Sequence, residues 1–183
     1  MEKENQRIKL TKTLLKNSLI ELMHKKPITK ITIKELCENA GINRSTFYLY
    51  YTDQFALLHE IEQELLLQSE NHIKKIGTNL AGISYLQELL HYMKDNSDIF
   101  RTLLCHQDNL PFQNAFIEAT IKYLKINVSL QCSEKISAYL YSYLTMGALS
   151  LIRKWIESDF DLTENELATL IFHISDKTVS IYN

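Results

Sequence analysis

The chain has few of the residues that build turns between strands. Of its 183 residues, only 4 are Gly and 2 are Pro, and hairpins and sheet-rich folds depend on both residue types. This scarcity excludes a β-rich or loop-rich fold. Leu, Ile, Lys and Glu predominate instead, and 45% of the residues are hydrophobic. The composition therefore predicts an all-α fold with an ample core.

The chain also lacks the signatures of metal, redox and membrane proteins. Its three cysteines, Cys37, Cys105 and Cys132, are widely spaced and form no C-x-x-C motif, so we expect reduced thiols and no metal site. No stretch approaches the ~20 apolar residues of a membrane span. The N-terminus is charged from the outset and has no apolar signal segment. These absences predict a soluble cytoplasmic protein.

Motifs for catalysis are missing too. The sequence contains no G-x-S-x-G, no H-E-x-x-H and no glycine-rich phosphate loop. Those motifs would supply a serine nucleophile, a zinc site or a nucleotide site. We therefore expect neither an enzyme nor a bound cofactor.

The two ends of the chain differ in charge. Residues 1–54 contain ten Lys/Arg and six Asp/Glu, a formal charge of +4, whereas residues 55–183 contain ten and sixteen, a formal charge of −6. A basic segment beside an acidic body is typical of a DNA-binding domain joined to another domain, because attraction to phosphates dominates non-specific affinity. A charge of +4 over this length is also within ordinary scatter, so the charge alone does not decide the function.

Residues 31–58 predict two short helices separated by a tight turn. Thr32 begins a Thr-x-x-Glu capping box at the start of the first helix, and Gly41 can take the positive φ that ends it. Asn43 is a suitable N-cap for the second helix, residues 44–51. The outward positions of this second helix carry an arginine, hydroxyls and tyrosines, which suit phosphates and base edges better than a core. The pattern indicates a helix-turn-helix whose second helix reads DNA.

Four short motifs follow one another in this region: T-I-K-E-L, A-G-I, S-T-F-Y-x-Y-Y and L-L. At this spacing, near the N-terminus, they resemble the TetR/AcrR (tetracycline-repressor-like) family of bacterial transcription regulators. The resemblance covers roughly residues 7 to 60. It implies a three-helix helix-turn-helix domain over residues 1–53, joined by a long helix to a helical effector-binding and dimerisation domain over residues 54–183. About nine helices are expected in all.

Several polar residues of this region are candidates for contact with DNA. Arg44 is the best candidate for a base contact because arginine donates two hydrogen bonds to guanine, although a phosphate contact or a free side chain are alternatives. Thr32 can offer its hydroxyl and N–H to a phosphate at the helix start, besides its capping role. Tyr48 and Tyr50 match family positions that grip phosphates. The full set of candidates is Thr32, Arg44, Ser45, Thr46, Tyr48, Tyr50, Gln54 and Lys30.

One position departs from the family pattern. The family commonly has a lysine at the start of its fourth helix, and this chain has Gln54 there. The amide weakens that phosphate anchor but can still donate a hydrogen bond. Three lysines near the edge of the domain are candidates for supplying the missing charge: Lys25, Lys26 and Lys30.

The last two predicted helices, residues 133–158 and 164–181, carry apolar side chains at helical spacing. Such stripes are more often intramolecular core than interface. This region resembles the C-terminal part of one TetR subgroup, and in that family the last two helices pair with their two-fold mates in a dimer. The residues expected at the interface of a homodimer are Leu144, Gly147, Leu151, Leu167, Leu170 and Ile174.

The resemblance also implies a pocket for a small-molecule effector inside the helical body. Aromatic side chains are frequent in this half of the chain, and several of them could line such a pocket. Aromatics at helical spacing are more often plain core. The residues expected to line the pocket are Tyr92, Phe100, Phe116, Tyr123, Tyr139 and Tyr143.

These expectations describe a dimeric regulator that binds a palindromic operator in double-stranded DNA. A repressor released by its effector is the first interpretation. The alternative is a coactivator or protein-interaction module of the same fold without independent operator binding, and Gln54 is the feature that favours it. Whether the protein represses or activates transcription stays open, because repressors and activators contact DNA through the same kinds of side chain.

Overall fold

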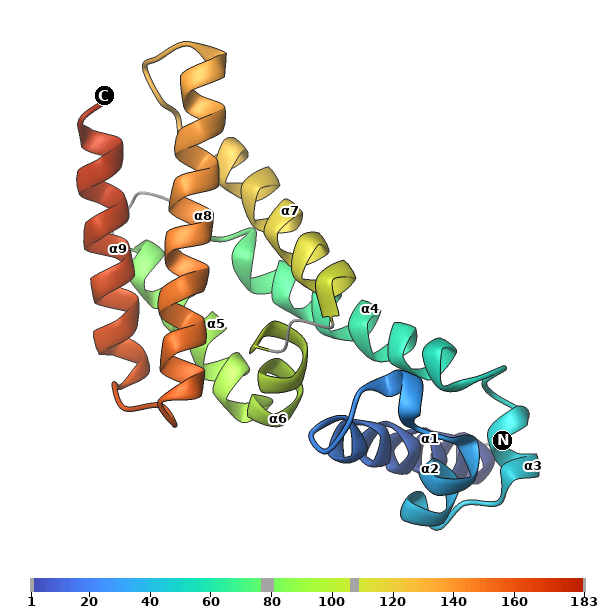
Figure 1. Cartoon of the computed structure of the whole chain (residues 1–183). Coiled ribbons are helices and arrows are strands. Elements are labelled where there is room, and N and C mark those ends of the chain that lie inside the picture. Colours follow the sequence, from blue (N-terminus) through green and yellow to red (C-terminus); the bar gives the residue numbers. More distant parts are fainter. Residues whose placement is uncertain (1, 77–80, 106–108, 183) are drawn as a thin grey trace. The chain divides into compact units, whose positions relative to one another are not determined.

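The computed structural model describes residues 2–76, 81–105 and 109–182 (Figure 1). Over these ranges the chain forms nine α-helices and no strand, which confirms the all-α prediction. The chain divides into two compact units, Met1–Leu65 and Leu66–Asn183. None of the helices in the described ranges is long and apolar enough to cross a bilayer.

The first unit is a small helical domain with its own core. Its elements are α1 (Glu2–Met23), the short 3₁₀ helix η1 (Ile28–Lys30), α2 (Ile33–Ala40), α3 (Arg44–Tyr48) and the first part of α4 (Gln54–Ile73). Helix α2 packs against both α1 and α3. The largest fully buried side chains of this unit are Leu15, Leu19, Ile31, Leu36, Phe47 and Leu57. These side chains come mainly from α1, α2, α3 and α4, so their packing holds α3 in a fixed position within the unit.

Local hydrogen bonds explain where the short helices begin and end. The Thr32 hydroxyl accepts the Glu35 N–H at 3.2 Å, which is one half of the predicted capping box. Gly41 ends α2 with a φ of 66°, and the N–H of Ile42 donates to the carbonyl of Cys37 at 2.9 Å. This pairing is the six-to-one bond of a Schellman turn, which needs a left-handed residue between its ends.

Side chains also mark the starts of α3 and α4. The Asn43 Oδ1 accepts the Ser45 N–H at 3.0 Å, as expected for an N-cap. Asp53 Oδ1 accepts the Ala56 N–H at 2.8 Å and so caps α4. Helix α3 is shorter than the predicted 44–51, since it ends at Tyr48 and the chain continues as a turn.

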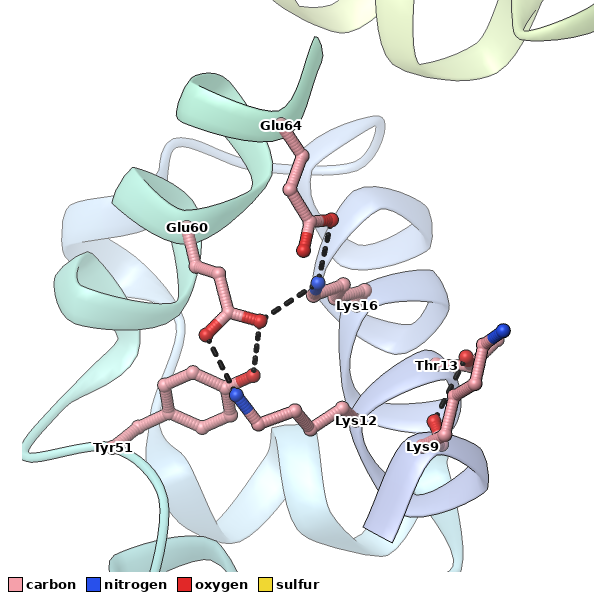
Figure 2. Close-up of polar contacts among 7 residues, drawn as sticks. All are labelled: Lys9, Lys12, Thr13, Lys16, Tyr51, Glu60 and Glu64. Carbon is pink, nitrogen blue, oxygen red and sulfur yellow. Dashed lines mark hydrogen bonds and ion pairs between the residues drawn. The ribbon is translucent and has the colours of Figure 1, made fainter. Parts of the chain in front are cut away.

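Ion pairs between α1 and the first part of α4 hold these two helices together (Figure 2). The Glu60 carboxylate accepts hydrogen bonds from Lys12 Nζ at 2.9 Å, Lys16 Nζ at 2.8 Å and the Tyr51 hydroxyl at 3.1 Å. Lys16 also pairs with Glu64 at 2.7 Å. The boundary between the compact units lies inside α4, at Leu65. The division into a DNA-binding domain and an effector-binding domain after residue 53 stays a prediction.

These contacts shift the pKa values of Glu60 and Tyr51. Burial acts to raise the pKa of Glu60, but hydrogen bonds from Lys16 and Lys12 outweigh it and hold the pKa below its ordinary value of 4.5. Burial, together with the Glu60 charge, raises the pKa of the Tyr51 hydroxyl. Tyr51 is therefore a neutral donor in the interior of the unit.

The second unit is a bundle of longer helices. Its elements are the end of α4, then α5 (Ala81–Asp95), α6 (Ser97–Phe100) running into the π-helix η2 (Arg101–Cys105), α7 (Leu110–Asn127), α8 (Glu134–Glu157) and α9 (Glu164–Ser180). Helix α5 packs against α9, and α8 packs against α7 and α9 (Figure 1). The largest fully buried side chains here are Leu90, Met93, Phe100, Leu103, Leu104 and Trp155.

The turn between α8 and α9 is held by hydrogen bonds on both sides. Asp159 and Phe160 both have positive φ, at 52° and 61°, and the indole N–H of Trp155 donates to the Leu162 carbonyl at 2.8 Å. Thr163 and Glu166 form a capping box at the start of α9, exchanging hydrogen bonds at 3.2 and 2.8 Å. Helix α9 is thereby fixed alongside α8.

Candidate nucleic-acid interface and effector cavity

Helix α3 presents a narrow exposed face. Phe47 is fully buried, and with about 100° between successive residues the positions opposite it are Ser45 and Leu49. These two residues are four apart and so lie one above the other. Leu49, the residue that directly follows α3, is 76% exposed. Sequence reasoning did not single out Leu49, and only its place opposite the buried Phe47 could have found it.

Arg44 opens this helix and is exposed. Its guanidinium makes no hydrogen bond or ion pair with any residue in the described part of the chain. By contrast, the Ser45 hydroxyl donates to the Asn43 side chain at 3.0 Å and belongs to the cap. Thr46 is only partly exposed. Of the three predicted first-turn contacts, Arg44 is therefore the side chain with the greatest freedom to bind a ligand.

The two tyrosines predicted to contact phosphates lie on opposite flanks of the exposed face. Tyr48 is 58% exposed and its ring meets Phe47 edge-on, with 5.5 Å between the ring centroids. Tyr50 is half-buried beside Tyr51. Neither the Tyr48 nor the Tyr50 hydroxyl is bonded to another described residue, so both can donate outward.

The lysines of this unit fall into two groups. Lys12 and Lys16 point toward Glu60 and Glu64 and are neutralised there, whereas Lys9 points away from them (Figure 2). Lys26 pairs with Glu35 at 2.6 Å. Lys30 is exposed, and within the described ranges it has no carboxylate partner.

The remaining predicted contacts lie at helix starts. Thr32 is exposed, and its hydroxyl still has a proton to donate after accepting the Glu35 N–H. Gln54 is the first residue of α4 and is half-buried. Its amide forms no hydrogen bond with other described side chains or backbone groups. Both residues could therefore meet a phosphate without breaking an existing bond.

The second unit contains an apolar cavity of about 100 Å³ between its helices. The lining comes mainly from α5, α7, α8 and α9, with Ile73 at the end of α4. Most lining side chains are aliphatic: Ile73, Ile76, Leu86, Leu89, Leu124, Val128, Leu144, Leu149, Ile152, Ile171 and Val179. A cavity of this character accepts an apolar group more readily than a charged one.

Of the six aromatic residues expected to line a pocket, Phe116 does line this cavity. Tyr139 and Tyr143 are 71% and 61% exposed on α8 and are not among the residues that line this cavity. Their side chains share the helix with the lining residues but point to solvent.

The other three aromatics have partners of their own. Tyr92 stacks on His72, with 5.3 Å between ring centroids, and meets Phe100 edge-on at 5.7 Å. The Tyr123 hydroxyl lies 3.4 Å from a Glu70 carboxylate oxygen. These three residues lie outside the lining of the cavity, and Phe100 is part of the core.

Helices α8 and α9 carry a shared apolar face that is open to solvent. We call it the α8–α9 face; its exposed members are Ile136, Tyr139, Tyr143, Met146, Leu170 and Ile174. A surface hollow of about 250 Å³ crosses it, with Gly147, Leu151 and Ile174 among its lining residues. Of the residues predicted for the interface, Leu144 and Leu167 are 6% and 2% exposed, and the other four are more exposed. Leu144 nevertheless borders the hollow.

Comparison with known proteins gives a consistent result. Residues 83–177, just over half of the chain, match the family model TetR_C_8, described as a transcriptional regulator C-terminal region. The HTH-type transcriptional regulator YxbF of Bacillus subtilis (strain 168) is 33% identical over 89 residues, which make up 49% of this chain. The match spans 22% of that relative's own length.

Solved structures share the fold at low sequence identity. A TetR transcriptional regulator from Streptococcus agalactiae 2603V has a TM-score of 0.68 and 22% identity, covering 94% of this chain and 97% of its own. The dihydroxyacetone kinase operon activator DhaS has a TM-score of 0.63 and 18% identity, covering 94% and 98%. A regulator from Streptomyces coelicolor has a TM-score of 0.66 and 14% identity, covering 93% and 83%. At these identities the likeness concerns the fold.

Proposed function

The chain belongs to the TetR family of transcriptional regulators, and we propose that it binds a palindromic operator as a homodimer and is released by a small molecule. Members of this family are regulators rather than enzymes. The observation that carries the proposal is the free face of α3, where Arg44 has no partner among the described residues and Leu49 is 76% exposed. As a DNA-binding regulator, the protein acts in the cytoplasm.

Base recognition falls to the two residues that α3 leaves free. The Arg44 guanidinium can donate two hydrogen bonds to O6 and N7 of a guanine in the major groove. Leu49 has no polar atom in its side chain, so its partner at a base edge is the methyl group of thymine. The operator half-site therefore contains a guanine and a thymine within reach of one short helix.

Phosphate contacts position the helix without reading sequence. The hydroxyls of Tyr48 and Tyr50 flank the reading face, and Thr32 and Gln54 add donors at two helix starts. Lys30 contributes a charge that no described carboxylate neutralises. Because counterion release scales with the phosphates contacted, affinity should fall steeply with added salt.

The α8–α9 face supports a homodimer. A row of exposed apolar side chains on two adjacent helices is typical of a protein–protein interaction site, and a two-fold interface needs a single self-complementary patch. Tyr143 borders the hollow at Gly147 and is itself exposed. A tyrosine from each subunit can enter the hollow of the other.

The apolar cavity supports control by an effector. Ile73 lines the cavity and ends α4, the helix that begins with Gln54 in the DNA-binding unit. A ligand changes operator affinity only if it binds one arrangement of the protein better than another. A ligand that contacts the end of α4 can therefore favour one position of this helix over another.

A second candidate function is that of a coactivator or protein-interaction module without operator binding of its own. Gln54 favours it, because the fourth helix begins without the usual positive charge. The structural relative DhaS is named an operon activator, which keeps activation open as the direction of control. The free Arg44 favours direct DNA binding.

A mobility-shift titration separates these candidates. The purified protein is tested against DNA from upstream of its own gene and of the neighbouring genes, with shuffled sequences as competitors. We expect a shift on at least one fragment that weakens by a factor of about 10 or more between 50 and 200 mM salt. Absence of any sequence-dependent shift would overturn operator binding and favour the coactivator.

A further inference from the structure

Helix α3 is too short to hold its own position. It contains five residues, Arg44–Tyr48, and isolated helices shorter than about 12–15 residues are marginal in water. Contacts with the rest of the unit must therefore place it. The Asn43 side chain caps its start, and Phe47 is buried in its middle. Both contacts lie at or before residue 47, whereas Leu49 and Tyr50, which are proposed to meet DNA, follow the helix.

Tyr51 closes this segment and is buried, with 4% of its surface exposed. Its hydroxyl donates to Glu60 Oε1 on α4 at 3.1 Å (Figure 2). Its ring lies against Phe47, with 5.6 Å between the ring centroids, and Lys12 Nζ lies 5.3 Å from the Tyr51 centroid. Among the residues that the structure describes, this is the one hydrogen bond between residues 43–51 and another helix. The Tyr51 hydroxyl therefore joins the segment that follows α3 to α4.

The acceptor of this bond is itself held in place. Glu60 Oε1 also accepts from Lys16 Nζ at 2.8 Å, and Oε2 accepts from Lys12 Nζ at 2.9 Å. Both lysines belong to α1. Hydrogen bonds to a charged acceptor are roughly twice as strong as neutral ones, and the bond from Tyr51 is of this kind. The end of the α3 segment is thus tied to α4 directly and to α1 through the Glu60 carboxylate.

We propose that the Tyr51–Glu60 hydrogen bond fixes the end of α3 for sequence recognition, so that Tyr51 and Glu60 are positioning residues that do not touch DNA. The inference rests on the proposed operator binding. Base contacts depend on the exact place of Arg44 and Leu49, whereas attraction to phosphates tolerates small displacements. Loss of the bond therefore weakens operator binding more than binding to unrelated DNA. A role in packing alone would lower stability and leave the ratio of the two affinities unchanged.

The test is Tyr51→Phe, which removes the hydroxyl and keeps the ring. In the DNA-free protein, the N–H groups of Tyr50 and of residue 51 both donate to the Phe47 carbonyl at 3.0 Å, so they report on the end of α3. Their hydrogen exchange should become about 3- to 10-fold faster. In fluorescence-anisotropy titrations, affinity for the operator should fall about 3- to 10-fold and affinity for unrelated DNA less than about twofold.

Lys16→Met is the matched control from the same cluster. It removes ion pairs with Glu60 and Glu64 at 2.8 and 2.7 Å, and among the described residues Lys16 has no bond to residues 43–51. This variant should lower the melting temperature at least as much as Tyr51→Phe does, while the exchange of the two N–H groups and the affinity ratio change less than about twofold.

Two results would overturn the inference. One is an unchanged exchange rate or an unchanged affinity ratio in Tyr51→Phe, and the other is an equal change of that ratio in Lys16→Met. Failure of the proposed function looks different, because the wild-type chain itself would then prefer no operator fragment over unrelated DNA. The exchange measurement needs no DNA, so it decides in either case whether Tyr51 holds the end of α3.

Discussion

The exposed side chains of α3 in the first unit and those of α8 and α9 in the second differ in chemistry. Around α3 they are an arginine, tyrosines and one leucine, whereas the α8–α9 face is almost wholly apolar. A polar surface is stable in water without a bound partner. An exposed apolar face is typical of a site where another protein binds. The comparison therefore supports the proposed DNA contact for the first unit and the proposed homodimer for the second.

The lysines of the first unit sharpen this contrast. Lys12 and Lys16 look like DNA contacts by charge, yet Glu60 and Glu64 bind them and stabilise the packing of α1 on α4 (Figure 2). Arg44 has the same charge but no such partner among the residues that the structure describes. Charge alone therefore does not identify a residue that contacts DNA. A better indication is a charged side chain that has no ion-pair partner and lies on a helix anchored by buried residues.

Loss of the α8–α9 face should have the largest effect. Ile174→Glu places one carboxylate from each subunit in the proposed two-fold interface, and burying such a charge without a partner costs several kcal/mol. We expect the dimer to weaken by more than about 100-fold, or about 3 kcal/mol, as measured by analytical ultracentrifugation. Leu110→Glu, at another exposed leucine in the same unit, is the control and should leave the dimer intact. An unchanged dimer in Ile174→Glu would place the interface elsewhere.

Removal of the free guanidinium should have the next largest effect. Arg44→Ala is expected to weaken operator binding by about 1–3 kcal/mol with the dimer unchanged, and to weaken binding to unrelated DNA much less. Fluorescence-anisotropy titrations on both DNAs measure this. The control is Lys34→Ala, since Lys34 is an exposed cation beside Glu38. An equal loss on both DNAs would reassign Arg44 to a phosphate.

The ion pairs that hold α1 to α4 predict an effect on stability and its pH dependence. Because the folded protein holds the pKa of Glu60 below 4.5, this carboxylate stabilises the fold above that pH, and its contribution is lost as the pH falls through the folded pKa. Glu60→Gln should therefore lower stability by about 1 kcal/mol at pH 7 and by less near pH 3.

Thermal unfolding at the two pH values tests this prediction. Glu38→Gln removes an exposed pair at 3.9 Å and serves as the control, with little change expected. A Glu60→Gln penalty that stays constant, or grows, on acidification would show that packing rather than charge explains the effect.

The smallest effect concerns the proposed thymine contact. Leu49→Ala should weaken operator binding by about 0.5–1 kcal/mol, since about 0.8 kcal/mol accompanies each buried methylene-sized group. Operator DNA with deoxyuridine in place of thymidine lacks the methyl group, and it should weaken binding by the wild-type chain as much as Leu49→Ala weakens binding to unmodified DNA. Leu49→Ala and the modified DNA together should lose no more binding free energy than either change alone. Additive losses would contradict direct contact, and Leu10→Ala, an exposed leucine of α1, provides the control.

Much of the fold could be predicted because its signals are local. The caps at Thr32 and Asn43 and the glycine at the end of α2 each act within five residues, and the structure contains all three. The fold class followed from composition and helical spacing. These features need no knowledge of distant contacts.

Contacts between elements could not be predicted in the same way. Helical spacing predicts which residues share a face but not what that face packs against, so it does not show that Leu144 is mostly buried within the subunit. It likewise does not show that mainly aliphatic side chains line the cavity while Tyr139 and Tyr143 are exposed. Pairing of Lys12 and Lys16 with glutamates 48 residues away could not be read from sequence.

A hydroxyl-radical footprint on the bound upstream DNA tests the central claim most directly. If two copies of α3 read a palindrome, the footprint should show two protected half-sites related by two-fold symmetry, with centres about 10–10.5 base pairs apart or a multiple of that distance. A guanine and a thymine should recur in each half. A single unsymmetric protected segment, or uniform weak protection, would contradict the account.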